Sequence, residues 1–388
     1  MSIKIPENLR FLSELYVRDS PVAVLLTEYP SSNSEDTVFQ NGSEFIIHDP
    51  FPPPPRELLK TLGPHHLMYG WGTHVSVTSE VRPPEMLLQH WRSVFGDEGI
   101  PNWIEFNRSD RFITLFPHQS LTPEQQVIEP RLNYRLHSKK VIEQIQCSQA
   151  DVFESVAIPC IVKLSHGYAG LGNFMINDAD DEVRMRTELE KHWPQSELVF
   201  NSVIKNIAGD YGVQFYLNRD GAAVWLGLTE QHFNEANRWC GGSYSQNLQT
   251  EMLEPFEPIV TATADYLHNE GYHGLVGIDI LQDDSGKCFL VDVNPRLTGI
   301  TPFLMASRIF SAVDGFGEGI YLASFRFAGT LEQLIETTES FENCRVMVLS
   351  AFEDLKAAEP FTICHLSVSS RSKQRNQEIL KTCTPTML

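Results

Sequence analysis

Two aspartates stand inside apolar runs on either side of a short polar turn, and this pattern constrains the fold more than any other. Asp279 lies in the run 274–281 and Asp292 in the run 287–293, and the turn between them predicts a hairpin. Antiparallel pairing would bring the two carboxylates close together on neighbouring strands. Like charges among apolar residues are costly unless a cation lies between them. The alternative interpretation is that both acids are structural and accept hydrogen bonds from the backbone.

The segment that follows the hairpin adds further polar ligands. Asn294 and Arg296 come shortly after Asp292 in the same stretch of chain. Two carboxylates and an amide oxygen form a set of hard oxygen ligands suited to Mg²⁺, which completes its shell with phosphate and water. Arg296 is placed to meet a phosphate or a carboxylate through two parallel hydrogen bonds. We therefore predict a metal site formed by Asp279, Asp292 and Asn294.

A second informative segment is the strand-like run 158–163, which ends in Lys163 and continues into a glycine-containing loop. Gly167, Gly170 and Gly172 follow, and glycines let backbone N–H groups approach an anion closely. A lysine beside such a loop is what a polyphosphate site needs in an acidic protein. The segment matches neither a Walker loop nor a dinucleotide fingerprint. A strand-to-hairpin turn with a surface lysine is the alternative interpretation of this segment taken by itself.

The charge balance limits the partners of the chain. Lys and Arg number 30 against 50 Asp and Glu, which gives a net charge of −20. Such a chain repels phosphate backbones and anionic lipid, so nucleic acid and membranes are disfavoured as partners. The sequence contains no long uncharged apolar run and no apolar signal-peptide core. The seven scattered cysteines never form C-x-x-C, which favours a reducing compartment, and we expect a cytoplasmic protein.

Hairpin signals interrupted by helical patterns predict an α/β fold built as α+β sandwich layers rather than a strictly alternating parallel sheet. Strands are expected at 22–26, 44–48, 112–116, 158–163, 198–204, 212–217, 222–229, 274–281 and 287–293. Helices are expected at 138–145, 181–193 and 258–269, with an amphipathic helix that begins at 83–85. The tail beyond 326 is expected to contain one helix with one or two strands, and 238–245 is expected to be a polar loop.

The lysine and aspartate segments resemble those of the ATP-grasp family. Its members carry a strand lysine, a glycine-rich lid loop, and much later an acidic strand residue, a hairpin and the motif acid-x-Asn-x-Arg. Lys163, the loop 165–173, Asp279 and the run 292–296 occupy these positions in the same order. The resemblance covers residues 131–325, about half of the chain. It implies an ATP-grasp fold with a preceding α/β N-terminal domain and a short C-terminal extension.

The resemblance also implies a division of the chain and an activity. Residues 1–130 would form the N-terminal domain, 131–205 the small or lid subdomain, 206–325 the large subdomain with the metal site, and 326–388 the C-terminal extension. The implied activity is ATP-dependent ligation of a carboxylate to an amine through an acyl phosphate, with release of ADP and phosphate. ATP and two Mg²⁺, which Mn²⁺ can replace, would be the cofactors. Small-molecule carboxylate and amine substrates would be the partners, and a homodimer is the default assembly.

Residue roles follow from the same resemblance. The two acids and the asparagine would bind the metal, catalytic roles fall to Lys163, Asn294 and Arg296, and Arg296 would also contact substrate. Nucleotide contacts are implied for an upstream lysine, the lid loop, the hinge and a strand-end acid: Lys139 or Lys140, Lys163, Ser165, His166, Gly167, Gly170, Gly172, Asn201, Ser202, Val203, Ile204 and Glu230. Ser243 is the implied substrate contact.

Several readings stay open at this stage. The sequence does not choose between Lys139 and Lys140, and Glu230 is equally well explained as a solvated acid at a strand end. The family commonly has Glu in the hinge, where this chain has Asn201 and Ser202. A phosphotransferase on the same fold, or a non-catalytic nucleotide-binding protein, is the alternative function.

Overall fold

The computed structural model describes residues 3–6, 9–30, 44–47, 54–167, 172–235 and 238–383. The strands are β1 Ile3–Lys4, β2 Ala23–Leu26, β3 Val77–Thr78, β4 Arg111–Ile113, β5 Val152–Phe153, β6 Cys160–Leu164, β7 Asn173–Ile176, β8 Leu198–Ser202, β9 Ile207–Leu217, β10 Ala223–Phe233, β11 Trp239–Ser245, β12 Gly274–Asp283, β13 Cys288–Asn294, β14 Glu318–Phe327, β15 Arg345–Asp354 and β16 Phe361–Ser370.

The α-helices are α1 Ser13–Asp19, α2 Arg56–Met68, α3 Glu85–Phe95, α4 Pro130–Leu136, α5 Ala179–His192, α6 Gln246–Glu251, α7 Leu253–Asn269, α8 Thr301–Asp314, α9 Leu331–Glu339 and α10 Lys373–Cys383. Short 3-10 helices are η1 Asp97–Gly99, η2 Pro123–Gln125 and η3 Lys139–Gln144. Within the described part of the chain, no helix combines the length and the apolar character that crossing a membrane requires.

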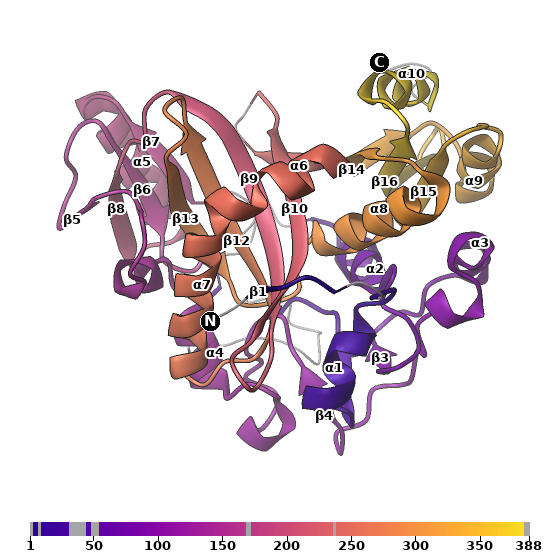
Figure 1. The fold of residues 1–388 in the computed structure, drawn as a ribbon, viewed down its shortest axis with the longest axis horizontal. Helices are drawn as coiled ribbons and strands as arrows, with labels where there is room; N and C mark the ends of the chain where they lie inside the picture. Colours follow the sequence, from indigo (N-terminus) through magenta and orange to yellow (C-terminus); the bar gives the residue numbers. More distant parts are fainter. Residues whose placement is uncertain are drawn as a thin grey trace.

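A large mixed sheet forms the centre of the molecule (Figure 1), with the strand order β13-β12-β9-β10-β11-β14-β16-β15 and β1 paired to β10. One face of its β9, β10, β12 and β13 part packs on α7 through a common apolar core that includes Phe256, Val213 and Ile278. Because side chains alternate along a strand, Asp279 between Ile278 and Ile280 faces away from this core. The predicted hairpin thus presents its acids on the open face.

A small sheet, β5-β8-β6-β7, lies beside the large one on the left of Figure 1 and packs on α5. Val162 and Leu164 of β6 join Met185 and Leu189 of α5 in its apolar core. Lys163 stands between the first two residues and therefore extends from the opposite face of the small sheet. The same alternation that buries this strand against α5 directs the lysine toward the large sheet.

The N-terminal part contains a parallel sheet in the order β3-β2-β4. The helix predicted to begin at 83–85 is present as α3, whose Leu87, Leu88 and Trp91 are buried. The strand predicted at 44–48 is wrong for its described residues, 44–47, which form bends and irregular chain. The strand predicted at 112–116 is limited to β4, because the chain turns away after Ile113.

Two further predictions differ from the structure. The segment 238–245, expected as a polar loop, is β11, whose glycines allow close pairing: a Cβ on Gly241 would lie 2.0 Å from the Tyr321 carbonyl oxygen. The described part of the tail, up to residue 383, contains two strands, within the prediction, and two helices rather than one. The boundary predicted after residue 325 falls inside β14, which pairs with β11 and β16, so the tail strands extend the large sheet.

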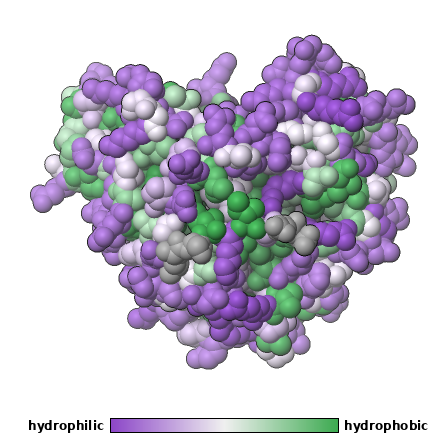
Figure 2. All heavy atoms as spheres, viewed as in Figure 1, coloured by the Kyte–Doolittle hydropathy of each residue, from purple (hydrophilic) through white to green (hydrophobic). Residues whose placement is uncertain are grey.

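Most of the face shown in Figure 2 carries polar residues, and apolar residues gather near its centre. The seven cysteines are all free. Cys160, Cys288, Cys364 and Cys383 are buried, so they serve as core residues rather than as bridges between elements.

Candidate active site

A cavity of about 740 Å³ lies where the open face of the large sheet meets the small sheet and the N-terminal part. Its lining brings together most of the residues singled out in the sequence: Lys139, Lys163, Gly167, Asn201, Ser202, Val203, Ile204, Asp279, Asp292, Asn294 and Arg296. The predicted motifs, which are more than 100 residues apart in the chain, therefore converge on one space.

Asp279 and Asp292 lie directly opposite each other on β12 and β13, as the hairpin predicts. A third carboxylate, Asp210 of β9, lines the same cavity and was not identified from the sequence. Burial and the neighbouring charges of Asp292 and Asp210 raise the pKa of Asp279. Burial also raises the pKa of Asp210 to about 6, while the Lys163 ammonium opposes the shift. Three acids in one buried space call for cations.

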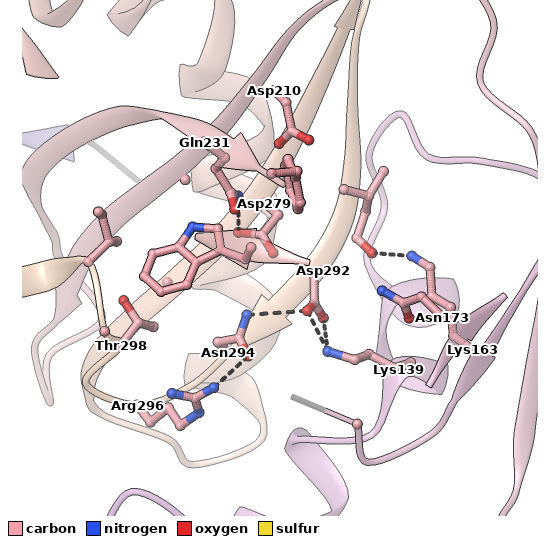
Figure 3. Close-up of a pocket in the computed structure, with 18 of the residues that line it drawn as sticks. Lys139, Lys163, Asn173, Asp210, Gln231, Asp279, Asp292, Asn294, Arg296 and Thr298 are labelled. Atoms are coloured by element: carbon pink, nitrogen blue, oxygen red, sulfur yellow. Dashed lines mark hydrogen bonds and ion pairs between the residues drawn. The ribbon is translucent and has the colours of Figure 1, made fainter. Parts of the chain in front are cut away.

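Two lysines meet these acids (Figure 3). The Lys139 Nζ donates to Asp292 Oδ1 at 2.5 Å and also to Oδ2. The Lys163 Nζ donates to the Val291 carbonyl oxygen at 2.9 Å. Burial lowers the pKa of Lys163, and Asp292 opposes this shift. In Figure 3 Lys139 contacts the Asp292 carboxylate, and Lys163 lies on the same side of the acids with its ammonium group on a backbone carbonyl oxygen.

The structure separates the two candidate lysines at the start of η3. Only 8% of the Lys139 side chain is exposed and it lines the cavity, whereas 47% of the Lys140 side chain is exposed. Lys140 pairs with Glu197 at 3.2 Å on the outside. Lys139 is therefore the lysine that faces the acids.

Asn294 and Arg296 continue the polar lining in a chain of hydrogen bonds. The Asn294 Nδ2 donates to Asp292 Oδ2 at 3.3 Å, and the Arg296 Nη2 donates to Asn294 Oδ1 at 3.3 Å. The Arg296 guanidinium also lies 4.8 Å from the Phe116 ring centroid. Among the described residues its buried Nε has no hydrogen-bond partner. Arg296 is thus held in place, and its Nε–H group can still donate a hydrogen bond to a ligand.

The lid loop contributes less to the cavity than the sequence suggested. Ser165 and His166 are buried, and the His166 ring stacks on Tyr134 with 3.9 Å between centroids. The His166 Nε2 is bonded to the Tyr134 carbonyl oxygen, so this side chain packs against α4. Gly172 supports strand pairing instead, because its φ is +75° and an added Cβ would lie 2.2 Å from Leu164 Cδ1. Gly170 lies outside the described residues.

The predicted hinge, 201–204, does line the cavity, together with Ile161 and Met175 of the small sheet and Ile207 of β9. In the small sheet, Asn201 of β8 pairs with Ile161 of β6 on one side and with Val152 of β5 on the other. The combination of backbone groups at a strand end with apolar side chains suits a flat aromatic ring.

Glu230 and Ser243 lie outside the cavity lining within the described part of the chain. The Glu230 carboxylate instead accepts hydrogen bonds from Ser243 and from Lys373, each at 3.2 Å. Its neighbour Gln231 lines the cavity and donates from Nε2 to Asp279 Oδ1 at 2.8 Å. Alternation along β10 places the two residues on opposite faces of the sheet.

The donor set fits a magnesium ion. No group of three His, Cys, Asp or Glu side chains in the described ranges is arranged to hold a metal. Asp279, Asp292 and the Asn294 amide oxygen form a sparser set, of the kind that Mg²⁺ takes when phosphates complete its shell. The ammonium of Lys139 already lies against both oxygens of Asp292, which shows that this position accepts a cation.

The far end of the cavity belongs to the N-terminal part and the tail. Its polar lining comprises Glu28, Arg56, Lys60, His66, Glu80, Tyr321 and His365, which sequence reasoning did not propose. The Tyr321 hydroxyl and the His365 Nδ1 are 2.7 Å apart, and the Tyr321 hydroxyl lies 3.4 Å from the His66 Nε2. The available signal was that Glu28 and Glu80 each lie two residues beyond a short strand, because ligands bind at the carboxyl ends of parallel strands.

Comparisons with known proteins agree with the predicted fold. Residues 138–294 match the family model described as L-aspartate–L-methionine ligase, ATP grasp. No curated protein sequence matches the chain.

Solved structures with the same architecture include an N5-carboxyaminoimidazole ribonucleotide synthetase in its ADP complex (11% identity, TM-score 0.53, covering 82% of this chain and 93% of that one). The Staphylococcus aureus N5-carboxyaminoimidazole synthetase complexed with ADP has 12% identity and a TM-score of 0.52, with 82% and 93% covered. The Aspergillus clavatus synthase, solved with ADP and 5-aminoimidazole ribonucleotide, has 11% identity and a TM-score of 0.51, with 82% and 94% covered. At these identities the likeness concerns the fold.

Proposed function

Since residues 138–294 match an ATP-grasp ligase family model and the similar solved structures share the fold, we propose that the chain uses ATP to join a carboxylate to an amine through an acyl phosphate. The observation that carries this proposal is the convergence of Lys139, Lys163 and the acid pair Asp279 and Asp292 on one cavity. Two ammonium groups beside buried carboxylates provide both the charge for a triphosphate and the ligands for its metal.

In the proposed reaction the substrate carboxylate oxygen attacks the γ-phosphorus of ATP, and the bond to the ADP oxygen breaks. The amine nitrogen then attacks the acyl carbon, phosphate leaves, and the nitrogen loses a proton. Catalysis of this kind rests on positioning and on stabilising charge spread over phosphoryl oxygens. This requirement matches a cavity lined by fixed cations.

Each lining residue has a role in this proposal. Lys163 and Lys139 neutralise the phosphates, and Lys139 moves from Asp292 to a phosphate oxygen when the nucleotide binds. Asp279, Asp292 and Asn294 hold Mg²⁺, which supplies charge neutralisation at the phosphates. Arg296, with its spare Nε donor, stabilises the acyl phosphate.

The adenine is proposed to lie against the hinge 201–204, between Ile161, Met175 and Ile207. Gly167 and Asn173 of the lid loop line the cavity, and their proposed role is to contact the phosphates. Asp210 and Gln231 join the predicted site as neighbours of the metal ligands. The roles proposed from sequence for Lys140, Ser165, His166, Glu230 and Ser243 have no support from the cavity, since these side chains lie elsewhere.

The matching family description makes two amino acids the first substrates to test, with L-aspartate and L-methionine as the leading pair. The N-terminal end of the cavity, with charged groups on an apolar wall, is the proposed substrate side. The homodimer and the cytoplasmic location remain predictions.

The proposal is tested by measuring ADP release from ATP and Mg²⁺ with amino acids supplied singly and in pairs, and by identifying the product by mass spectrometry. We expect ADP release that requires both partners and a product lighter than their sum by one water. ADP release with a single hydroxyl substrate, yielding a phosphorylated product, would establish a phosphotransferase instead. Thermal stabilisation by ATP without turnover in any pair would support the non-catalytic alternative.

A further inference from the structure

Glu28 is a buried carboxyl group at the N-terminal end of the cavity that the reaction described above does not use. It follows β2 by two residues, at the carboxyl end of a parallel strand, and it is 6% exposed. Its Oε1 accepts the backbone N–H of Glu80. Its Oε2 is buried and has no hydrogen-bond partner among the described residues, although Glu28 lines the cavity. A buried acceptor oxygen without a hydrogen-bond donor indicates that a ligand supplies the donor.

The nearby cations are already engaged by another acid. The Lys60 Nζ pairs with Glu80 Oε1, and the Arg56 Nη2 lies 3.7 Å from the same oxygen. Glu80 is therefore compensated twice, whereas no lysine or arginine of the described chain forms an ion pair with Glu28. Burial lowers the pKa of His118, and the backbone of Glu28 opposes this shift, so this imidazole lies beside the same segment.

Burial raises the pKa of Glu28 to about 8, with a further rise from Glu80 and an opposing effect of Lys60. The raised pKa favours the protonated form of the empty carboxyl group near neutral pH. A ligand with its own positive charge would supply the missing hydrogen bond and would favour the ionised form.

We propose that Glu28 binds a primary ammonium group of an amino-acid substrate, and that it thereby selects amino-bearing substrates over their desamino analogues. This inference rests on the proposed ligase function, since it places a substrate at the N-terminal end of the same cavity. The apolar side chains of Leu59, Leu62 and Leu67 line this end and provide contact for the aliphatic part of such a ligand. A desamino ligand lacks the charged donor that favours the ionised form of Glu28, so it should gain less from binding beside this carboxyl group.

The experiment compares ligand pairs that differ only in the amino group. Binding of L-aspartate and succinate, and of L-methionine and its desamino analogue, is measured by calorimetry in the presence of Mg²⁺ and a non-hydrolysable ATP analogue. The wild type should bind at least one amino acid roughly 10- to 100-fold more tightly than its desamino partner. Glu28→Gln should remove this preference and leave affinity for the desamino compound within about twofold.

Two further variants make the result specific. Glu57→Gln changes the same charge on the exposed side of α2 and should keep the full preference. Glu28→Asp keeps the charge on a shorter side chain and should retain part of the preference, which a purely structural role would not produce. Equal weakening of both ligands by Glu28→Gln, an unchanged preference, or no preference in the wild type would overturn the inference.

Binding of the ATP analogue alone separates this inference from the ligase proposal. Glu28→Gln should bind it as the wild type does, because Glu28 is not among the residues proposed to hold the phosphates or the metal. If the wild type bound no nucleotide, the ligase proposal would fail, and the amino acid comparison would still report on Glu28 by itself.

Discussion

The two ends of the cavity bury acidic side chains in opposite ways. At the phosphate end, Asp292 is neutralised by the ammonium of Lys139 and receives further hydrogen bonds from Asn294 and the Val293 backbone. At the N-terminal end, Glu28 receives one backbone hydrogen bond and keeps a bare oxygen. One acid has a cationic partner within the protein, and the other has none among the described residues.

This difference indicates which kind of ligand each end of the cavity can bind. An ion pair can open to let a metal replace the ammonium, which keeps the site charged and ready for a triphosphate. A protonated carboxyl can give up its proton to a cationic ligand, which makes recognition depend on the charge of that ligand. The phosphate end therefore binds the nucleotide whatever the other substrates are, and the N-terminal end selects among those substrates.

The largest expected effect is at the phosphate end. Asp292→Asn removes a metal ligand and its charge while changing little volume, so turnover should fall by at least about 1,000-fold. Steady-state ADP release at saturating Mg²⁺ measures this, and circular dichroism checks that the fold is kept. Near-normal turnover would defeat the metal assignment. Glu197→Gln, which removes an exposed acid paired with Lys140, serves as the charge-matched control and should change turnover by less than about twofold.

The adjacent lysines give a matched pair with the next largest effect. Lys139→Met should raise the KM for ATP about 100-fold, because a buried ammonium group loses its place at the phosphates. Lys140→Met removes the same charge from an exposed position and should leave the KM within about twofold. Equal KM values in the two variants would remove the distinction that the structure makes between them.

The residues of the phosphate end could be predicted from the sequence because they belong to short segments with fixed spacing. Asp279 and Asp292 stand in apolar strands joined by a tight turn, so the register of one hairpin places them opposite each other. Lys163 ends an apolar strand in the same manner. Asp210 was missed because it precedes the apolar part of β9 and reaches the cavity only through pairing with β12.

The N-terminal end could not be predicted in this way. Glu28, Lys60 and Tyr321 come from a parallel strand, a helix and a strand near the end of the chain, and no local pattern relates them. The choice of Glu230 shows a related difficulty. A bulge in β10 between Trp225 and Gly227 shifts the alternation, so the sequence alone does not show which of two neighbouring residues faces the cavity.

Gln231 and Glu230 test that alternation directly. Gln231→Leu removes the hydrogen bond that orients Asp279, so the Mg²⁺ concentration for half-maximal turnover should rise about 10-fold. Glu230→Gln alters the outer face and should leave the Mg²⁺ requirement unchanged, since its carboxylate meets Ser243 and Lys373. A larger effect for Glu230→Gln than for Gln231→Leu would place the metal on the other face of β10.

The smallest expected effect concerns stability at the N-terminal end. The pKa of Glu28, raised to about 8 in the folded chain, returns to its ordinary value on unfolding, so the folded state holds a proton that the unfolded state releases between those values. The contribution of Glu28 to the free energy of unfolding therefore decreases as pH rises from about 5 to 8. Glu28→Gln has no such proton and keeps an oxygen for the Glu80 N–H. Chemical denaturation should show that the free energy of unfolding of the variant, relative to the wild type, is higher at pH 8 than at pH 5 by on the order of 1 kcal/mol or more. A pH-independent difference would contradict the raised pKa of Glu28 in the empty protein.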